Sequence, residues 1–231
     1  MRQSSAQNRN VSRAAAVPKP KRAEQALVRR RAIVDAAIEE FLEKGFAATR
    51  VEDIARRAGV AKGTIYLNFE DKEALFAAIV EQEIRPKVDL ASTAPLPEET
   101  LYSYADRVLV PRIGELVRSR RAAIIRLLIG EAGRFPKLAE HYFRLVVQPG
   151  LGGVRGLVRE AVRRGELSDD MLVKFPHLMV APAIMSVIWT GLFQQFSSLD
   201  VEAMLRAYYR HVLTCADGEP LEAVGRRKTA K

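Results

Sequence analysis

The segment from Thr49 to Lys72 constrains this chain most, because it holds two helices too short to be stable alone. Thr49 and Glu52 have the spacing of a capping box, which starts a helix. Gly59 supplies a residue that can end this helix in a left-handed conformation, and a second helix begins near Lys62. Isolated helices below about 12 residues are marginal in water. The segment therefore predicts further helices packed against it.

The apolar residues of this segment are spaced so that each short helix has one inward face. In the first helix the spacing is i, i+3, i+4 and i+7, at Val51, Ile54, Ala55 and Ala58. In the second helix Ile65 and Phe69 face inward and polar residues take the other faces. We expect a supporting helix over residues 27–44, ended by Gly45, and a fourth helix that starts at an Asp71 cap.

Two short helices joined by a tight turn, with polar groups on the outer face of the second, indicate a helix-turn-helix that binds DNA. Groups of this kind contact phosphates and base edges in the major groove. A glycine at position 63 lets the backbone approach the duplex. The predicted DNA-contacting residues are Thr49, Arg50, Lys62, Gly63, Thr64, Tyr66, Asn68 and Lys72.

The stretch GFAATRVEDIARRAGVAKGTIYLNFEDKEALFAAIV strongly resembles the DNA-binding domain of the TetR family of bacterial transcriptional regulators. The resemblance covers roughly residues 27–84 and rests on four short motifs: Gly45-Phe46, Ala58-Gly59-Val60, Lys62-Gly63-Thr64-Ile65-Tyr66 and Lys72-Glu73-Ala74-Leu75-Phe76. Asn68 stands where the family more often has histidine, and an asparagine can still donate to a phosphate. The resemblance implies that the last two long helices pair with their two-fold mates as a four-helix bundle. It also implies that the helices before them enclose a ligand pocket.

The net charge of +9 lies mainly at the two ends of the chain. Residues 1–22 contain six Lys or Arg and residues 225–231 contain four, with no acidic residue in either stretch, which leaves a net charge of −1 for the rest. We expect residues 1–23 to be a disordered basic tail, either an arm that contacts DNA or a solvated leader. Between it and a flexible basic tail at 217–231 we expect a helix-turn-helix domain over 24–72 and a ligand-binding and dimerisation domain over 73–216.

The remainder of the chain reads as helix, without the alternating pattern of strands, so the predicted fold class is all-α. The segment 178–193 is apolar on every side but shorter than the roughly 20 residues of a membrane span. Because such a helix has to be covered on all sides, it predicts a homodimer through residues 171–214 and no membrane partner. The other expected helices are 98–117 with a kink at Pro111, a buried helix over 120–132, 137–147 and 149–164 split at Pro149, and 200–215.

These features together predict a ligand-responsive transcriptional regulator, most simply a repressor that binds a palindromic operator as a dimer. A small apolar or amphipathic effector would shift helix four and change the separation of the two recognition helices. Side chains that combine a large apolar face with a polar handle are typical of small-molecule sites, and the predicted lining set is Tyr102, Arg126, Phe135, Tyr142, Met185 and Trp189. The alternative is an effector-independent DNA-binding regulator with a filled core.

Residue types needed for other functions are scattered or missing. Cys215 is the only cysteine and the three histidines, His141, His177 and His211, are far apart in sequence, so no metal site, cofactor or disulfide is expected. A single cysteine and the lack of a signal-peptide pattern favour a cytoplasmic protein. An enzyme is the less favoured alternative, since its only candidate residues are Glu131, Arg134 and His141.

Overall fold

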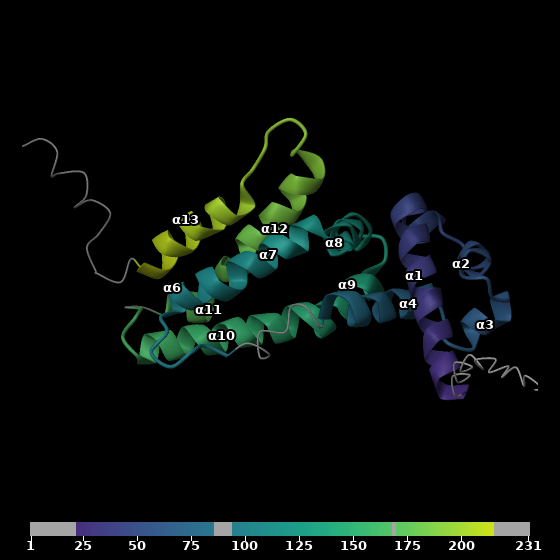
Figure 1. The fold of residues 1–231 in the computed structure, drawn as a ribbon, viewed down its shortest axis with the longest axis horizontal. Helices are drawn as coiled ribbons and strands as arrows, with labels where there is room; N and C mark the ends of the chain where they lie inside the picture. Colours follow the sequence, from purple (N-terminus) through teal and green to yellow (C-terminus); the bar gives the residue numbers. More distant parts are fainter. Residues whose placement is uncertain (1–21, 86–93, 168–169, 215–231) are drawn as a thin grey trace, which may run out of the picture.

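The computed structural model describes residues 22–85, 94–167 and 170–214, and these residues form helices and connecting turns without a strand among them (Figure 1). The predicted all-α fold class is confirmed. The two predicted tails and Cys215 lie outside the described residues, except that Arg22 and Ala23 already belong to the first helix.

The N-terminal unit consists of four helices and a π-helical extension: α1 (Arg22–Ala48), α2 (Val51–Ala58), α3 (Lys62–Tyr66), α4 (Lys72–Ile79) and η1 (Val80–Ile84). Gly45 interrupts α1 with φ +81°, a left-handed conformation that glycine adopts without strain. One further helical turn, which ends at Ala48, follows Gly45. The predicted Asp71 cap is confirmed, since its carboxylate accepts from the Ala74 N–H at 2.6 Å.

The capping box predicted at Thr49 is wrong. The N-cap of α2 is Arg50, which makes no side-chain capping bond. The Thr49 hydroxyl donates instead to the carbonyl oxygens of Gly45 at 2.7 Å and Glu40 at 3.0 Å. The interruption of α1 leaves its last carbonyl groups short of helical donors, and the single O–H of the buried Thr49 is shared between two carbonyl oxygens beside it.

The C-terminal unit places α12 and α13 together on one side, with α10 running along the opposite side (Figure 1). In the same view α2 and α3 lie at the far end of the molecule from α6 and α11. The elements of the C-terminal unit are α6 (Leu101–Tyr104), η3 (Ala105–Leu109), α7 (Val110–Arg118), α8 (Arg120–Glu131), α9 (Pro136–Tyr142), η4 (Phe143–Val147), α10 (Gln148–Arg163), α11 (Met171–Lys174), α12 (His177–Leu192) and α13 (Val201–Thr214).

Two prolines predicted to disturb helices are accommodated by a change of helix type. The π-helical segment η3 precedes Pro111, and η4 precedes Pro149. A π-helical turn bonds each N–H one residue further back than an α-helix does, which makes room for a ring that lacks the N–H. The split predicted at Pro149 is therefore wrong, because one continuous helix runs from Pro136 to Arg163.

One hydrophobic core joins the two units. Buried residues of α1 and α4 form a single cluster with residues of α8 and α9 and with Val187 of α12. Phe46 lies within it, with its ring centroid 4.9 Å from that of Phe135 and 5.1 Å from that of Phe41. The hydrophobic core thus continues across the domain boundary expected between residues 72 and 73. The expectation that α8 is a buried helix fails at Ile129, which is 49% exposed.

Phe46→Ala should lower the free energy of unfolding by about 3–5 kcal/mol, because it empties a fully buried site that four rings share. Urea denaturation followed by circular dichroism measures the change. Phe143→Ala removes a ring that is 53% exposed and should change the free energy by less than about 0.5 kcal/mol. Equal losses in the two variants would contradict the central place of Phe46.

Candidate functional site

The turn between α2 and α3 fixes the direction in which α3 faces. Gly59 ends α2 with φ +66°, and the Val60 N–H donates back to the Ala55 carbonyl at 3.0 Å. Ile65 and Phe69 anchor α3 in the core at 2% and 4% exposure. Because the apolar face of α3 is held in this way, its other face is turned to solvent.

The solvent face of α3 carries polar groups that are already ordered. Lys62 Nζ lies 2.5 Å from Glu52 Oε1 and 5.8 Å from the centroid of the Tyr66 ring, which is 49% exposed. The Glu52 carboxylate raises the pKa of Lys62, so this lysine is fully charged at neutral pH. Asn68 Nδ2 donates to the Thr64 carbonyl at 2.7 Å. Contacts between exposed charges are weak, so a phosphate could replace Glu52 as the partner of Lys62.

Gly63 lies in the middle of this face and leaves it open. A Cβ atom built at Gly63 would have no neighbour within 4 Å, so the protein's own packing does not require glycine here. Arg50, at the start of α2, is exposed next to this face. The surface formed by α3 and the start of α2 can therefore receive a molecule that approaches the backbone closely and carries negative charge.

Two residues predicted to contact DNA have structural roles instead. Lys72 Nζ donates to the carbonyl oxygens of Phe46 at 2.6 Å, Thr49 at 3.0 Å and Ala47 at 3.3 Å, and lies 4.5 Å from the Phe46 ring centroid. Its three N–H donors are thereby used, and burial lowers its pKa. Thr49 is buried with its hydroxyl bonded inward, so only its backbone remains to meet a phosphate.

The sequence contained a signal for this role of Lys72. Once Gly45 is recognised as an interruption of α1, the carbonyl groups at that end need donors. Lysine side chains are frequent donors at helix C-termini.

The structure does not bring the six predicted ligand-binding residues together. Phe135 packs on Phe46 at the junction of the two units, and Met185 is 44% exposed on α12. The Tyr102 hydroxyl accepts from Arg210 at 3.4 Å, near the other end of the molecule. Tyr142 packs against the core cluster that joins the two units, and burial raises its pKa to about 12.

The remaining two residues of that set make contacts to backbone carbonyls. Arg126 Nη1 donates to the Val187 carbonyl at 3.3 Å, and its side chain packs against Gly191. The Trp189 indole N–H donates to the Ser197 carbonyl at 2.9 Å. Size and polarity do not tell which way a side chain points once its helix is packed, which is why the six residues do not line one common groove.

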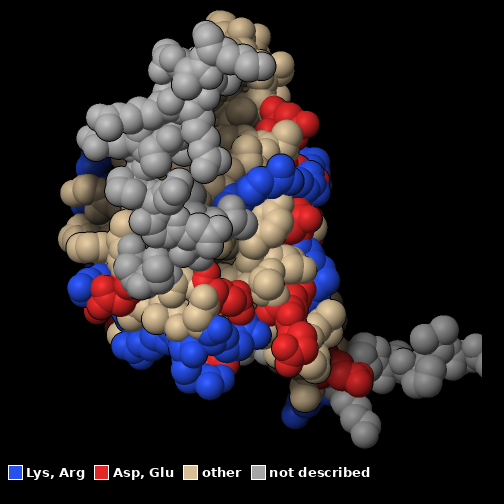
Figure 2. All heavy atoms as spheres, turned by 90° about the vertical axis from the view of Figure 1, so that its left-hand side faces the viewer, with Lys and Arg blue, Asp and Glu red and all other residues tan. Residues whose placement is uncertain are grey.

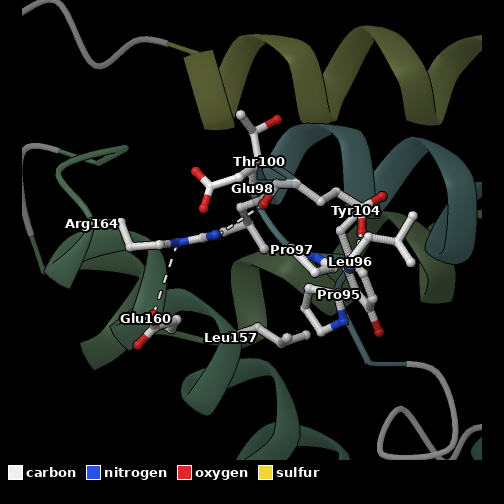
Figure 3. Close-up of a pocket in the computed structure, with 11 residues that line it drawn as sticks. Pro95, Leu96, Pro97, Glu98, Thr100, Tyr104, Leu157, Glu160 and Arg164 are labelled. Carbon is white, nitrogen blue, oxygen red and sulfur yellow. Dashed lines mark hydrogen bonds and ion pairs between the residues drawn. The ribbon is translucent and has the colours of Figure 1, made fainter.

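A groove of about 370 Å³ lies instead where the segment before α6 crosses α10 (Figure 3). None of the residues predicted to bind a ligand lies there. The walls are formed by Pro95, Leu96, Pro97, Glu98, Glu99, Thr100, Leu101, Tyr104, Leu157, Glu160 and Arg164.

An ion pair between the buried Glu99 and the exposed Arg107 holds one wall of this groove. Arg107 donates to both carboxylate oxygens of Glu99, at 2.7 Å and 2.6 Å. The Arg107 guanidinium lowers the pKa of Glu99 to about 2, against the opposing effect of burial. The Leu96 N–H also donates to Glu99, at 2.9 Å, so the carboxylate fixes the segment that crosses α10.

The candidate enzyme residues make separate structural contacts or lie exposed. Glu131 Oε1 accepts from the Ala47 N–H at 3.4 Å, His141 Nδ1 lies 3.4 Å from Arg144, and Arg134 is exposed. The described part of the chain contains no group of three or more His, Cys, Asp or Glu residues that could hold a metal ion. None of the described helices is both long and apolar enough to span a bilayer.

Two family profiles match this chain. The profile described as bacterial regulatory proteins, tetR family, matches residues 33–79, which contain α2, α3 and α4. The profile described as tetracyclin repressor-like, C-terminal domain, matches residues 106–207.

Individual proteins are similar over most of the chain. The HTH-type transcriptional regulator YdeS of Bacillus subtilis is 32% identical over 163 residues, 70% of this chain and 79% of that protein. The HTH-type transcriptional repressor SCO4008 of Streptomyces coelicolor is 26% identical over 69% of this chain and 82% of its own length. The solved structure of a SmeT–triclosan complex has the same fold, with a TM-score of 0.69 and 22% identity over 80% of this chain and 91% of that one.

Glu99→Gln should lower the free energy of unfolding at neutral pH by about 1–3 kcal/mol, the range for hydrogen bonds to a charged group. Because folding lowers the pKa of Glu99 from 4.5 to about 2, its contribution is complete above about pH 4.5 and is lost as the pH falls to about 2. Urea denaturation at neutral pH and near pH 3 should therefore show a smaller difference from the parent chain in acid. A Glu140→Gln control, at an exposed position, should show no such pH dependence.

Proposed function

This chain belongs to the tetR family of bacterial regulatory proteins, and from that premise we propose that it is a homodimeric repressor released from its operator by a small apolar effector. It regulates transcription through a helix-turn-helix. The observation that carries the proposal is the geometry of α3, which is anchored by Ile65 and Phe69 and presents an open polar face. Similarity to a protein named as a repressor supports repression as the outcome.

DNA recognition is proposed to centre on α3 in the major groove. The side chains that remain available there are Arg50, Lys62, Thr64, Tyr66 and Asn68, with Gly63 allowing close approach. Arg50 and Lys62 suit phosphates, whereas the Tyr66 ring and the Asn68 amide suit base edges or the sugar backbone. Lys72 and Thr49 stabilise this surface indirectly. They bond carbonyl groups at the end of α1, directly before the start of α2.

The proposed dimer interface is the outer side of α12 with α13 beside it. Leu178, Met185 and Leu192 are exposed at helical spacing on α12, together with Ala181. A contiguous exposed apolar stripe of this kind marks an interaction site. Two-fold pairing through it would give two recognition helices, which fits half-sites about 34–36 Å apart on one face of the duplex.

Control by a small effector is supported by the groove beside α6. Its volume of about 370 Å³ lies within the usual range of small-molecule sites, roughly 300–1,000 Å³. A regulator that responds to no ligand has no need of such a space, so the groove favours the ligand-responsive reading over a filled core. The relative solved with triclosan has this fold, which shows that the fold can hold a small apolar molecule.

Lys62→Ala and Tyr66→Ala should each weaken operator binding by about 1–3 kcal/mol, because each removes a direct contact to DNA. The operator is obtained by selection from a random duplex library with the full-length chain, and affinities follow from fluorescence anisotropy at fixed salt. Arg159→Ala is the matched control, since it removes one exposed positive charge on α10, away from α3. If the Lys62 and Tyr66 variants bind like the control, the assignment of α3 as the recognition helix fails.

Leu192→Arg should turn the dimer into a folded monomer, because a buried charge without a partner costs several kcal/mol at an interface. Leu192 is 53% exposed in the single chain, so its replacement leaves the subunit core intact. Leu205 would be a poor choice, since it is fully buried within its own subunit. Light scattering after gel filtration measures the mass, with Phe143→Arg as the control outside the stripe. A dimeric Leu192→Arg variant would exclude this interface.

A further inference from the structure

We propose that the groove beside α6 binds a small apolar amine, a molecule with an apolar body and one positive charge. The inference rests on the proposed function, because it names the chemical class of the effector that function requires. Three features of the groove carry it: apolar walls, an unpartnered buried hydroxyl and an excess of carboxylates.

The walls would hold an apolar body. Pro95, Leu96 and Pro97 cross over α10 on one side, and Leu157 of α10 reaches toward them from the other (Figure 3). Leu101 and Tyr104 of α6 complete the wall. A site built mainly from proline, leucine and an aromatic ring removes apolar ligand surface from water, which stabilises binding by roughly 25 cal/mol for each Å².

The hydroxyl of Tyr104 is a polar group that lacks a partner. Tyr104 is fully buried and lines the groove, yet its oxygen has no hydrogen-bond partner among the residues that the structure describes. By contrast, the equally buried Tyr209 hydroxyl donates to the Met179 carbonyl at 3.0 Å. A buried hydroxyl without a partner is costly and rare. The oxygen has no exposed surface, so a ligand's N–H donor would satisfy it by displacing the groove wall beside it, because a hydroxyl oxygen accepts as well as donates.

The charges around the groove favour a cation. Three carboxylates line it, those of Glu98, Glu99 and Glu160, against one guanidinium, that of Arg164. Arg107 pairs with Glu99 and Arg163 pairs with Glu160, so among the described residues Glu98 carries the lining's unpaired negative charge. Arg164 is already engaged, since it lies 2.5 Å from Glu166 and donates to the Glu99 carbonyl at 3.0 Å. No positive charge in the lining is therefore left for an anionic ligand.

Glu98 is the carboxylate available to the ligand. Within the described residues it makes no hydrogen bond or ion pair, whereas Glu99 is paired with Arg107. Its backbone has φ +59°, the one positive value among the described residues other than glycine. Such strain costs about 1–3 kcal/mol and tends to occur at binding sites.

The described surface at this end of the molecule carries charges of both signs. Figure 2 views the molecule from the end that carries α6 and α11, and acidic and basic side chains lie side by side on the part of the face that is not grey. At about 0.1 M salt, dissolved ions screen exposed charges beyond about 10 Å. The preference for a positive ligand would thus come from the lining residues.

The position of the groove also indicates how a ligand bound there would affect the DNA-binding unit. Leu157, Glu160 and Arg164 lie at one end of the continuous helix that starts at Pro136. The other end of that helix packs against α4, where Lys137 lies 3.9 Å from Asp71, the cap of α4. A ligand that displaces the end of α10 would therefore move a rigid element in contact with the DNA-binding unit.

The test uses three probes of matched shape: naphthylmethylamine, naphthalenemethanol and naphthoate, which are positive, neutral and negative at neutral pH. Isothermal titration calorimetry measures each with the full-length chain. The amine should bind about tenfold more tightly than naphthoate, as expected for a hydrogen bond to a charged group. Equal affinities, or tighter binding of naphthoate, would overturn the proposal.

Variants locate the site. Glu98→Gln should abolish most of the preference for the amine, whereas Glu140→Gln, at an exposed position on α9, should leave it unchanged. Leu157→Arg should block all three probes, because a charged chain would fill the groove. Unchanged affinities in both groove variants would show that the amine binds elsewhere.

Tyr104→Phe distinguishes a ligand contact from a structural role. Loss of the Tyr104 hydroxyl should weaken amine binding about three- to tenfold. It should not lower the unfolding midpoint, because the hydroxyl has no hydrogen-bond partner in the free chain among the described residues. Tyr209→Phe should lower the midpoint and leave amine affinity unchanged. If Tyr104→Phe binds the amine like the parent chain, the hydroxyl has no part in the site.

Calorimetry without DNA separates this inference from the proposed function. A chain that selects an operator but prefers naphthoate refutes the amine site and leaves the repressor proposal standing. A chain that selects no operator refutes the repressor proposal, while the ranking of the three probes still decides the chemistry of the groove.

Discussion

The interruption of α1 at Gly45 is the constraint on which the rest of the structure depends. It frees carbonyl groups at the end of α1, and these are bonded by Lys72 from the start of α4 and by Thr49 before α2. The same turn places the Phe46 ring between α1, α4 and the residue that precedes α9. One local break in a helix thus fixes both the start of the helix-turn-helix and its attachment to the C-terminal unit. An orphaned carbonyl is costly, so the arrangement has little freedom.

The attachment of the two units has a consequence for regulation. Glu131 accepts from Ala47 and lies close to Gly45, while Arg120 of α8 forms ion pairs with Asp35 of α1 and Glu83 of η1, both at 3.0 Å. Contacts of the C-terminal unit thus reach the N-terminal unit through α1 and η1 as well as through α4. A change in the packing of α8 or α9 would therefore tilt the N-terminal unit as a body. Packed cores respond to such changes by shifting between discrete arrangements.

Two residues with one predicted role have another because carbonyl groups next to them accept their donors. Lys72 and Thr49 have the residue types of phosphate ligands, yet nearby carbonyl groups take their donors. Conversely, the groove contains Tyr104, a residue that no sequence pattern singled out, and its hydroxyl has no partner among the described residues. Chemical type therefore indicated which residues can bind, and neighbours decided which are free to do so.

The sequence by itself determined the all-α class, the short helices α2 and α3 with their inward residues, the break at Gly45 and the Asp71 cap, because these follow from local periodicity and backbone chemistry. The solvent-exposed polar face of α3 was predictable for the same reason. Only the tertiary structure decided that Pro149 lies within a continuous helix, that six candidate pocket residues lie apart, and that a groove forms beside α6. These depend on how helices rotate and pack against one another, which is set by contacts between residues far apart in the chain.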